Sequence, residues 1–458
     1  MMTDWNDKRV LILGAARQGI ALARWLAHHG SRVTLSDSRQ MDDLTSARAA
    51  LVDINVKWIV GGHPLELLET TDVLCPSGGV PLTLPIVQEA LKRGIPLSND
   101  TQIFMEVAAC KTIGITGSAG KTTTTTLVGN MAKIAVGERA YIGGNIGDPL
   151  INYVDNMHTD DLAVLEISSF QLDQMNISPN ISAILNITPN HLDRHGTMEA
   201  YINAKARILD FQTGKDIAVL SRDDNGAWNL RDRVKGKLYT FSLHELDAGL
   251  NGAYLYNGSL NLRDENVNAP LLRRDDIHLR GDQNVSNVLA AFTIGHAAGF
   301  KADDMLKAVR EFRGVPHRLE LVRELHGVRW YNDSTATTPE RSMAAIHAFD
   351  EPIVLMLGGR DKDLPWEGIA KLIHQRVEHV VLFGEAAEMI EKAITDIKSE
   401  GSVELCRVKS LKEAVARAAE ISRAGDIVLL SPGGTSFDEF KDFAERGEAF
   451  RKWVMELS

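Results

Sequence analysis

The sequence predicts an α/β protein of three domains. Its 458 residues exceed what one hydrophobic core usually organises, because domains average about 100 to 200 residues. Three stretches of the chain also alternate short apolar runs, typical of buried strands, with longer amphipathic stretches typical of helices. The alternation restarts near residues 99 and 314, so we predict domains at 1–99, 100–314 and 315–458.

Composition narrows the classes of function. The formal net charge of −11 disfavours a nucleic-acid partner, since phosphate binding there depends on Lys and Arg. The three cysteines, Cys75, Cys110 and Cys406, are far apart and favour neither a disulfide framework nor a zinc site. The N-terminus lacks the pattern of a signal peptide, and no apolar run approaches the roughly 18 residues of a membrane span. We expect a cytoplasmic protein without a membrane span, acting as a monomer.

The first segment, "RVLILGAARQGIALARWLAHHGSRVTLSD", predicts a strand, a glycine turn, a helix and a second strand that ends at Asp37. Gly14-x-Ala16-x-x-Gly19 resembles the fingerprint of a Rossmann-like dinucleotide site, in which a diphosphate lies at the helix N-terminus. The methyl group of Ala16 hinders close approach of a dinucleotide, so we favour another nucleotide diphosphate. An ordinary strand–helix turn remains the alternative.

The second segment contains "ITGSAGKTTTTTLVGNM", residues 115–131. Gly117-x-x-Gly120-Lys121-Thr122 is a shortened form of the phosphate-binding loop G-x-x-x-x-G-K-[ST]. Its glycines let backbone N–H groups turn toward phosphate, Lys121 can contact the β- and γ-phosphates, and Thr122 can bind Mg²⁺. The threonines that follow are poor helix formers, so their helix must be stabilised by packing. No N-K-x-D motif is present, which disfavours a GTPase.

Two candidate metal ligands follow the next strands. Glu166 lies in "VLEISSFQLD" and His191 in "LNITPNHLDRHG". Ligand chemistry in open α/β sheets gathers at the carboxyl ends of the strands, where a carboxylate could ligate Mg²⁺. Taken alone, Glu166 is more often a solvated acid at a strand end, and His191 is more often structural. Further along, "VRWYNDS", "PIVLMLGG", "HVVLFG" and "DIVLLSPGG" predict a third, open parallel sheet in a Rossmann-like C-terminal domain.

The strings "TGSAGKTTT", "LEISSFQLD" and "NITPNHLDRHG", in this order and spacing, resemble the Mur ligases over essentially the whole chain. In the third segment "HRLE", "WYNDSTATTPE", "LGGRDKD" and "LLSPGGTSFDEFKDFAERG" are similar to the members that add D-glutamate to UDP-N-acetylmuramoyl-L-alanine. The resemblance implies an ATP-dependent, amide-forming ligase of peptidoglycan precursor synthesis that forms an acyl phosphate. It also implies two Mg²⁺ ions and a carbamylated Lys205, a residue that its helical context alone predicts to be solvated.

The motifs and the resemblance together assign the site residues. ATP binding falls to Gly117, Ser118, Ala119, Gly120, Lys121, Thr122, Thr123, Asn287, His317, Arg318 and Asp333, and catalysis to Lys121, Glu166, His191 and Lys205. The UDP substrate is assigned to Gly14, Ala15, Ala16, Asp37, Ser38, Arg39, Asn145 and His191. D-glutamate is assigned to Thr337, Lys362, Ser436, Phe437 and Phe443, and metal to Thr122, Glu166, His191 and Lys205.

Two departures from the family pattern and three alternatives stay open. Ala119 stands where many members have Asn, which leaves phosphate binding intact, and Thr335 stands where some have Lys, which puts one cationic contact in doubt. The alternatives are a nicotinamide-dependent oxidoreductase, a non-catalytic nucleotide switch, and a ligase of the same family that adds another amino acid. Product formation in the presence of ATP and a panel of amino acids distinguishes them.

Overall fold

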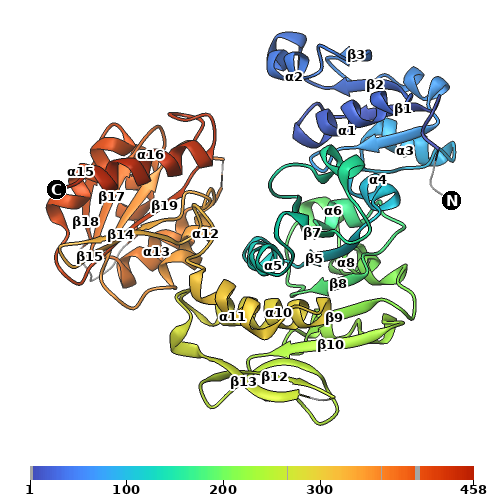
Figure 1. The fold of residues 1–458 in the computed structure, drawn as a ribbon. Coiled ribbons are helices and arrows are strands. Elements are labelled where there is room, and N and C mark those ends of the chain that lie inside the picture. Colours follow the sequence, from blue (N-terminus) through green and yellow to red (C-terminus); the bar gives the residue numbers. More distant parts are fainter. Residues whose placement is uncertain (1–3, 266, 363, 398–402) are drawn as a thin grey trace. The chain divides into compact units, whose positions relative to one another are not determined.

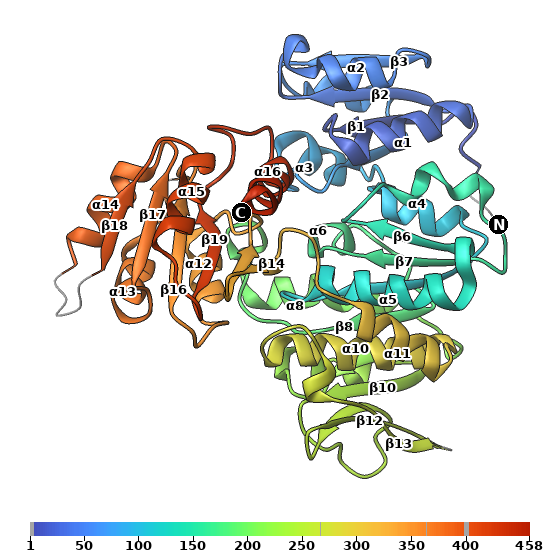
Figure 2. The ribbon, with the colours of Figure 1, turned by 60° about the vertical axis from the view of Figure 1, so that its left-hand side comes forward.

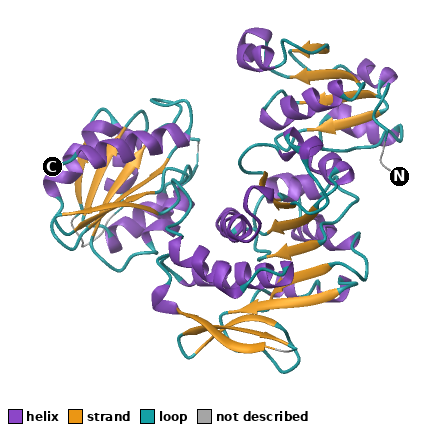
Figure 3. Cartoon of the chain, in the orientation of Figure 1, coloured by secondary structure: helices purple, strands orange, loops and turns teal. Residues whose placement is uncertain are grey.

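The structure is a computed structural model that describes residues 4–265, 267–362, 364–397 and 403–458. Three separate sheets follow one another along the chain, each flanked by helices (Figures 1 and 3). The predicted α/β fold with three sheet-containing segments is confirmed, whereas the two boundary positions stay predictions. Across the described ranges, no helix combines the length and the apolar character needed to cross a lipid bilayer.

The first sheet has four parallel strands in the order β3-β2-β1-β4. Both faces of β1 are buried, one among residues that include Leu22 and Leu26 of α1 and the other among residues that include Ile86 and Val87 of α3. Such a strand reads as a continuous apolar run. The elements are β1 (Arg9–Leu13), α1 (Arg17–His28), β2 (Arg32–Asp37), α2 (Thr45–Ala50), β3 (Val56–Val60), β4 (Val73–Pro76) and α3 (Pro85–Lys92).

The second sheet has nine strands in the order β13-β12-β11-β10-β9-β8-β5-β7-β6. Its parallel part places β5 between β8 and β7. The strands are β5 (Lys111–Thr116), β6 (Ala140–Gly144), β7 (Leu162–Glu166), β8 (Ile181–Ile184), β9 (Ile217–Ser221), β10 (Lys237–Ser242), β11 (Gly252–Tyr256), β12 (Ser259–Asp264) and β13 (Val267–Arg273). The helices are α4 (Asp100–Val107), α5 (Lys121–Val136), α6 (Ser169–Leu172), α7 (Leu192–His195), α8 (Met198–Asp210), α9 (Asn225–Trp228), α10 (Asp282–Ala298) and α11 (Ala302–Glu311).

Packing stabilises α5 despite its threonine-rich start, as the sequence predicts. Thr123, Thr124 and Thr125 are buried, and α10 and α11 pack against α5. On the sheet side, a Cβ added at Gly129 would lie 2.6 Å from Ile142 of β6. The absence of that carbon lets the helix approach the sheet closely.

The third sheet has the order β14-β15-β19-β16-β17-β18, with helices on both faces (Figure 2). Its strands are β14 (Glu320–Leu325), β15 (Val328–Asn332), β16 (Ile353–Gly358), β17 (His379–Phe383), β18 (Glu404–Arg407) and β19 (Ile427–Gly433). The helices are α12 (Pro339–Ile346), α13 (Glu367–Arg376), α14 (Ala387–Thr395), α15 (Leu411–Ile421) and α16 (Phe443–Glu456). The sheet is parallel except for β14, because His326 and Gly327 adopt positive φ angles and turn β14 back antiparallel to β15.

The chain forms two compact units. One contains the first and second sheets, with residues up to 278 and 282–311. The other contains the third sheet, with residues 279–281 and 312–458.

Candidate active site

The predicted phosphate loop joins β5 to α5. Gly120, the residue before the helix, has a φ of +80°, and a Cβ added there would lie 2.3 Å from Asn287 Oδ1. Position 120 therefore requires glycine for both conformation and space. Lys121 opens the helix, and its Nζ donates to the carbonyl oxygen of Gly117 at 2.8 Å. The lysine turns back over the loop, where a phosphate could accept from it instead.

Asn186, which the sequence analysis missed, holds this loop from the end of β8. Its Oδ1 accepts from Ala119 N at 2.8 Å, its Nδ2 donates to Ala119 O at 3.1 Å, and its carbonyl oxygen accepts from Ser118 N at 2.9 Å. The only sequence signal is its position directly after a buried strand. Asn287 lies against the same loop and the start of α5, since a Cβ added at Gly120 would lie 2.3 Å from its Oδ1, which also accepts from Thr124 Oγ1 at 3.4 Å.

Glu166 ends β7 and has only 2% of its surface exposed. Asn145, from the turn after β6, donates from Nδ2 to Glu166 Oε1 at 2.9 Å. The other carboxylate oxygen, Oε2, is buried and has no hydrogen-bond partner among the described residues. A buried carboxylate oxygen without a donor is costly in an empty site and suits a bound cation. The placement of Glu166 and Asn145 therefore fits a metal beside the phosphate loop.

Lys205 lies in α8 with 1% of its surface exposed, so the solvated position that its helical context predicts is wrong. Its Nζ donates to Gly117 O at 2.9 Å and Thr116 Oγ1 at 3.3 Å, beneath the phosphate loop. Burial, and next the charge of Lys121, hold the pKa of Lys205 well below its ordinary value. The side chain therefore lies next to the predicted nucleotide, and loses its proton more readily than an exposed lysine does.

His191 precedes α7 in a left-handed conformation, with a φ of +54°, and its side chain is exposed. The His191 ring meets the Phe170 ring edge-on, with the centroids 5.1 Å apart. In the described part of the chain, His, Cys, Asp and Glu side chains form no group of three that could hold a metal alone. The ligand roles of Thr122, Glu166, His191 and Lys205 therefore stay predictions.

Six of the predicted UDP residues lie at the carboxyl edge of the first sheet, and the other two, Asn145 and His191, lie on loops of the second sheet. The six are Gly14, Ala15, Ala16, Asp37, Ser38 and Arg39. Gly14 has a φ of +95°, and Gly19 has no room for a Cβ, which would lie 2.0 Å from Gly14 O. Asp37 accepts from Ala15 N at 2.8 Å and from Arg39 Nη2 at 2.8 Å. The hydrogen bonds from Arg39 hold the pKa of Asp37 well below its ordinary value. Asp37 thus fixes two of the other residues predicted to bind the nucleotide.

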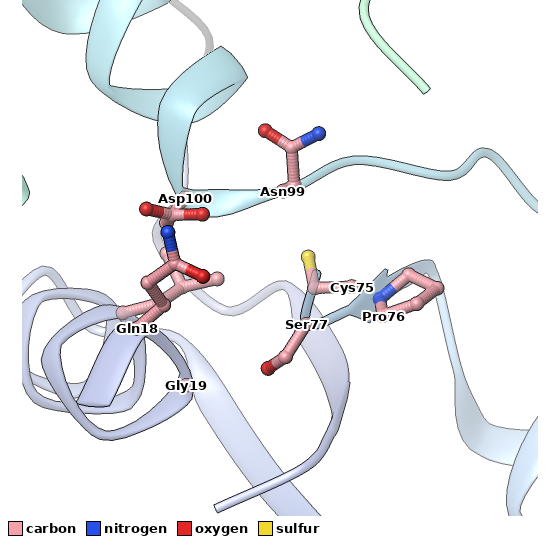
Figure 4. A pocket seen from close by; sticks show the side chains of 8 residues that line it. Gln18, Gly19, Cys75, Pro76, Ser77, Asn99 and Asp100 are labelled. Carbon is pink, nitrogen blue, oxygen red and sulfur yellow. The ribbon is translucent and has the colours of Figure 1, made fainter. Parts of the chain in front are cut away.

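A pocket opens beside this glycine turn. It is lined by residues of α1, β4 and the start of α4: Gln18, Gly19, Leu22, Cys75, Pro76, Ser77, Asn99 and Asp100 (Figure 4). Ser77 donates from Oγ to Gly14 O at 3.1 Å, so the segment "PSGGVP" forms a second glycine-containing turn against the first. The sequence analysis missed this turn, although Gly78 and Gly79 follow an apolar strand. Burial raises the pKa of Asp100 to about 6.

Two contacts connect this pocket to the phosphate-loop side within the same compact unit. Gln18 Nε2 lies 3.5 Å from Gly144 O, one residue before Asn145. Arg194 Nη1 donates to Gly79 O at 3.4 Å while its guanidinium lies 4.7 Å from the centroid of Phe170. Gln18, beside the first glycine turn, therefore contacts the residue before Asn145, and Gly79, in the second turn, contacts the short helix that follows His191.

The remaining predicted ATP residues lie in the other compact unit. Asp333 follows β15, accepts from Ser431 Oγ at 2.9 Å and from Leu319 N at 3.2 Å, and burial raises its pKa to about 6. His317 O accepts from Thr335 Oγ1 at 2.9 Å. The hydroxyl of Thr335 is thus used within the fold and supplies no positive charge. Arg318 is exposed.

The five predicted D-glutamate residues surround the carboxyl ends of three adjacent strands. Thr337 follows β15, Lys362 follows β16, and Ser436 and Phe437 follow β19, while Phe443 begins α16. Ser436 is buried, whereas Phe437 and Phe443 are 61% and 44% exposed. One cation, hydroxyl groups and exposed rings at one sheet edge suit a small acidic ligand.

Family models match all three parts of the chain. They are described as Mur ligase MurD-like, N-terminal domain, over residues 8–99; Mur ligase middle domain, over 115–295; and Mur ligase, glutamate ligase domain, over 317–434. The first and last ranges contain the first and third sheets, and the middle range contains the second sheet except for residues 111–114 of β5. The comparison therefore follows the same division as the fold.

Two relatives that match over nearly the full length carry the same name. The UDP-N-acetylmuramoylalanine--D-glutamate ligase of Caldanaerobacter subterraneus subsp. tengcongensis is 39% identical over 456 residues, and that of Symbiobacterium thermophilum is 38% identical over 452. Each alignment covers 99% of both chains.

Solved structures share the fold at lower identity. UDP-N-acetylmuramate-alanine ligase from Thermotoga maritima has a TM-score of 0.58 and 18% identity, covering 98% of this chain and 99% of that one. MurF from Acinetobacter baumannii has a TM-score of 0.60 and 16% identity, covering 100% of this chain and 93% of that one. These two likenesses concern the fold alone.

Proposed function

Because the chain belongs to the Mur ligase family, we propose that it joins D-glutamate to UDP-N-acetylmuramoyl-L-alanine with hydrolysis of ATP to ADP and phosphate. The observation that carries the proposal is the match, over nearly the whole length, with relatives of that name. We expect the enzyme to act as a cytoplasmic monomer.

The reaction needs an activated acid, because a carboxylate resists attack by an amine. A carboxylate oxygen of the substrate attacks the γ-phosphorus of ATP, and ADP leaves. The neutral amine of D-glutamate then attacks the acyl carbon, phosphate leaves with one of the former carboxylate oxygens, and the amine gives up a proton. No protein nucleophile is required. The residues bind, orient and neutralise charge.

The phosphate loop would hold the triphosphate. Lys121 Nζ now donates to Gly117 O, a contact that it can exchange for oxygens of the β- and γ-phosphates. The N-terminus of the 16-residue helix α5 adds a positive potential at the same place. These groups stabilise charge that develops during phosphoryl transfer.

Glu166 and Thr122 would hold one Mg²⁺, and His191 with Lys205 a second. The unpartnered Oε2 of Glu166 supports the first site. Bound Mg²⁺ would neutralise phosphate charge and orient the phosphoryl group. Asn145 keeps the Glu166 carboxylate in place through its bond to Oε1.

Lys205 would act as a carbamate. In its neutral form the amine attacks carbon dioxide, an N–C bond forms and one proton is released, which turns the neutral amine into an anionic carbamate. Burial next to Lys121 lowers the pKa of Lys205 and so supports the reactive form. A carbamate signal in the ¹³C NMR spectrum with labelled bicarbonate, absent from Lys205→Ala, is expected. An unchanged spectrum in the two proteins would exclude the modification.

The C-terminal unit would bind D-glutamate, its two carboxylates being met by Lys362 and by the hydroxyl groups of Thr337 and Ser436. Phe437 and Phe443 would cover the aliphatic part. The test incubates the protein with ATP, Mg²⁺, UDP-N-acetylmuramoyl-L-alanine and each of D-glutamate, L-glutamate and L-lysine. We expect phosphate release and a product of the mass of the D-glutamate adduct with D-glutamate only. Equal stimulation by L-lysine would overturn the amino-acid assignment.

A further inference from the structure

Arg446 is a fully buried cation in the C-terminal unit. It lies in the first turns of α16, and its exposed fraction is 0%. In the described chain, no carboxylate oxygen lies within ion-pairing distance of its guanidinium. Burial lowers the pKa of Arg446 to about 10, so the group keeps its proton at neutral pH. Since burying a charge is costly, its partners must compensate for lost water.

Those partners belong to the loops that follow the strands. Arg446 donates from Nε to Ser334 Oγ at 3.0 Å, from Nη2 to Ser334 O at 2.9 Å and from Nη1 to Gly434 O at 3.1 Å. Ser334 follows β15 and Gly434 follows β19. A third loop touches the same group, because a Cβ added at Gly359, after β16, would lie 3.0 Å from Nη1.

The three strands are neighbours in the sheet, in the order β15-β19-β16. Each of their loops carries a residue that is predicted to bind D-glutamate: Thr337, Ser436 or Lys362. Ser334 Oγ also donates to Phe443 O at 2.8 Å, which connects the start of α16 to the same network. One guanidinium therefore joins every segment that contributes to the predicted amino-acid site.

We propose that Arg446 is the positioning residue of the amino-acid site, holding the loops after β15, β16 and β19 at the spacing that binding of the dicarboxylate requires. The proposal rests on the function proposed above. The planar fork of arginine reaches acceptors on two loops at once, which the single ammonium of a lysine cannot reproduce. The charges of Asp438 and Glu439 also act on Arg446, so its proposed role follows from the geometry of the fork and not from its charge.

The decisive variant is Arg446→Lys, which keeps the charge and loses the fork. We expect KM for D-glutamate to rise at least about tenfold, with KM for the UDP-linked substrate unchanged because its predicted residues lie in the other compact unit. Ser334→Ala removes only the hydroxyl partner. It should raise KM for D-glutamate by a smaller factor, which keeps the proposal testable if Arg446→Lys fails to fold.

Arg323 provides a matched control. It also donates to backbone carbonyls, those of Val454, Met455 and Leu457, but at the opposite end of α16. Arg323→Lys should lower thermal stability and leave KM for D-glutamate unchanged. Hydrogen exchange adds a readout independent of turnover: amides of 332–337 and 433–437 should exchange faster in Arg446→Lys and Ser334→Ala, and at the wild-type rate in Arg323→Lys.

The results distinguish a failure of the positioning role from a failure of the proposed function. An unchanged KM for D-glutamate and unchanged exchange in Arg446→Lys and Ser334→Ala would overturn the positioning role, as would a parallel rise of both KM values. A wild-type protein that forms no product with D-glutamate would instead overturn the proposed function, while the exchange rates would still decide whether Arg446 orders the loops.

Discussion

Replacing Gly120 by alanine isolates the contribution of the phosphate loop. At a φ of +80° an L-residue costs about 1 to 2 kcal/mol relative to glycine. The new Cβ would also lie 2.3 Å from Asn287 Oδ1, so that this side chain would have to move by about 1 Å to reach an ordinary contact distance. In the free protein the loop can relax in part, so one part of the cost appears as lower stability and the other as weaker nucleotide binding. We expect the Kd for ADP to rise at least about tenfold, which corresponds to about 1.4 kcal/mol.

Gly258→Ala is the control for backbone strain alone. Gly258 has a φ of +72° in the turn between β11 and β12, and no atom lies within 4 Å of an added Cβ. Both variants should lose stability by about 1 kcal/mol in thermal unfolding, but only Gly120→Ala should weaken ADP binding in a calorimetric titration. Wild-type affinity in Gly120→Ala, or an equal loss in both variants, would refute the assignment of the loop.

The other predictions concern buried charges. The pKa of Asp100 is raised from 3.8 to about 6 in the folded protein, so its ionisation lowers the free energy of unfolding as pH rises through that range, by at most about 3 kcal/mol. Asp100→Asn should therefore raise the melting temperature at pH 8 and not at pH 4. An equal change at both pH values would contradict this. Mg²⁺ should tighten ADP binding about tenfold in the wild type and not in Glu166→Gln, as measured by calorimetry with and without EDTA. Lys205→Ala should lose product formation by about 100-fold or more, without rescue by bicarbonate, and normal turnover would exclude a role for Lys205.

Local sequence patterns predicted the parts of the site that depend on local geometry. The phosphate loop, the strand that ends at Glu166 and the glycine turn at Gly14 each combine an apolar strand with glycine or polar residues at or directly after the end of that strand. Parallel strands place those ends together, and the structure has Glu166 at the end of β7 and Lys121 at the start of the helix that follows the adjacent strand β5.

Features that depend on distant contacts were not predicted. Lys205 is buried because its side chain reaches Thr116 and Gly117 at the end of β5, and a helix pattern carries no information about that contact. Asn186 acts through hydrogen bonds to a loop 67 residues away. The antiparallel strands β11 to β13 were not predicted either, although Asn257-Gly258 between alternating residues is a local signal for a two-residue hairpin.

The central claim is that the chain makes an acid reactive by transferring a phosphoryl group to it. UDP-N-acetylmuramoyl-L-alanine labelled with ¹⁸O in both carboxylate oxygens tests this directly when the mass of the released phosphate is measured. Formation of an acyl phosphate predicts one labelled oxygen in each phosphate and one in the new amide. Product formation with unlabelled phosphate would contradict the account.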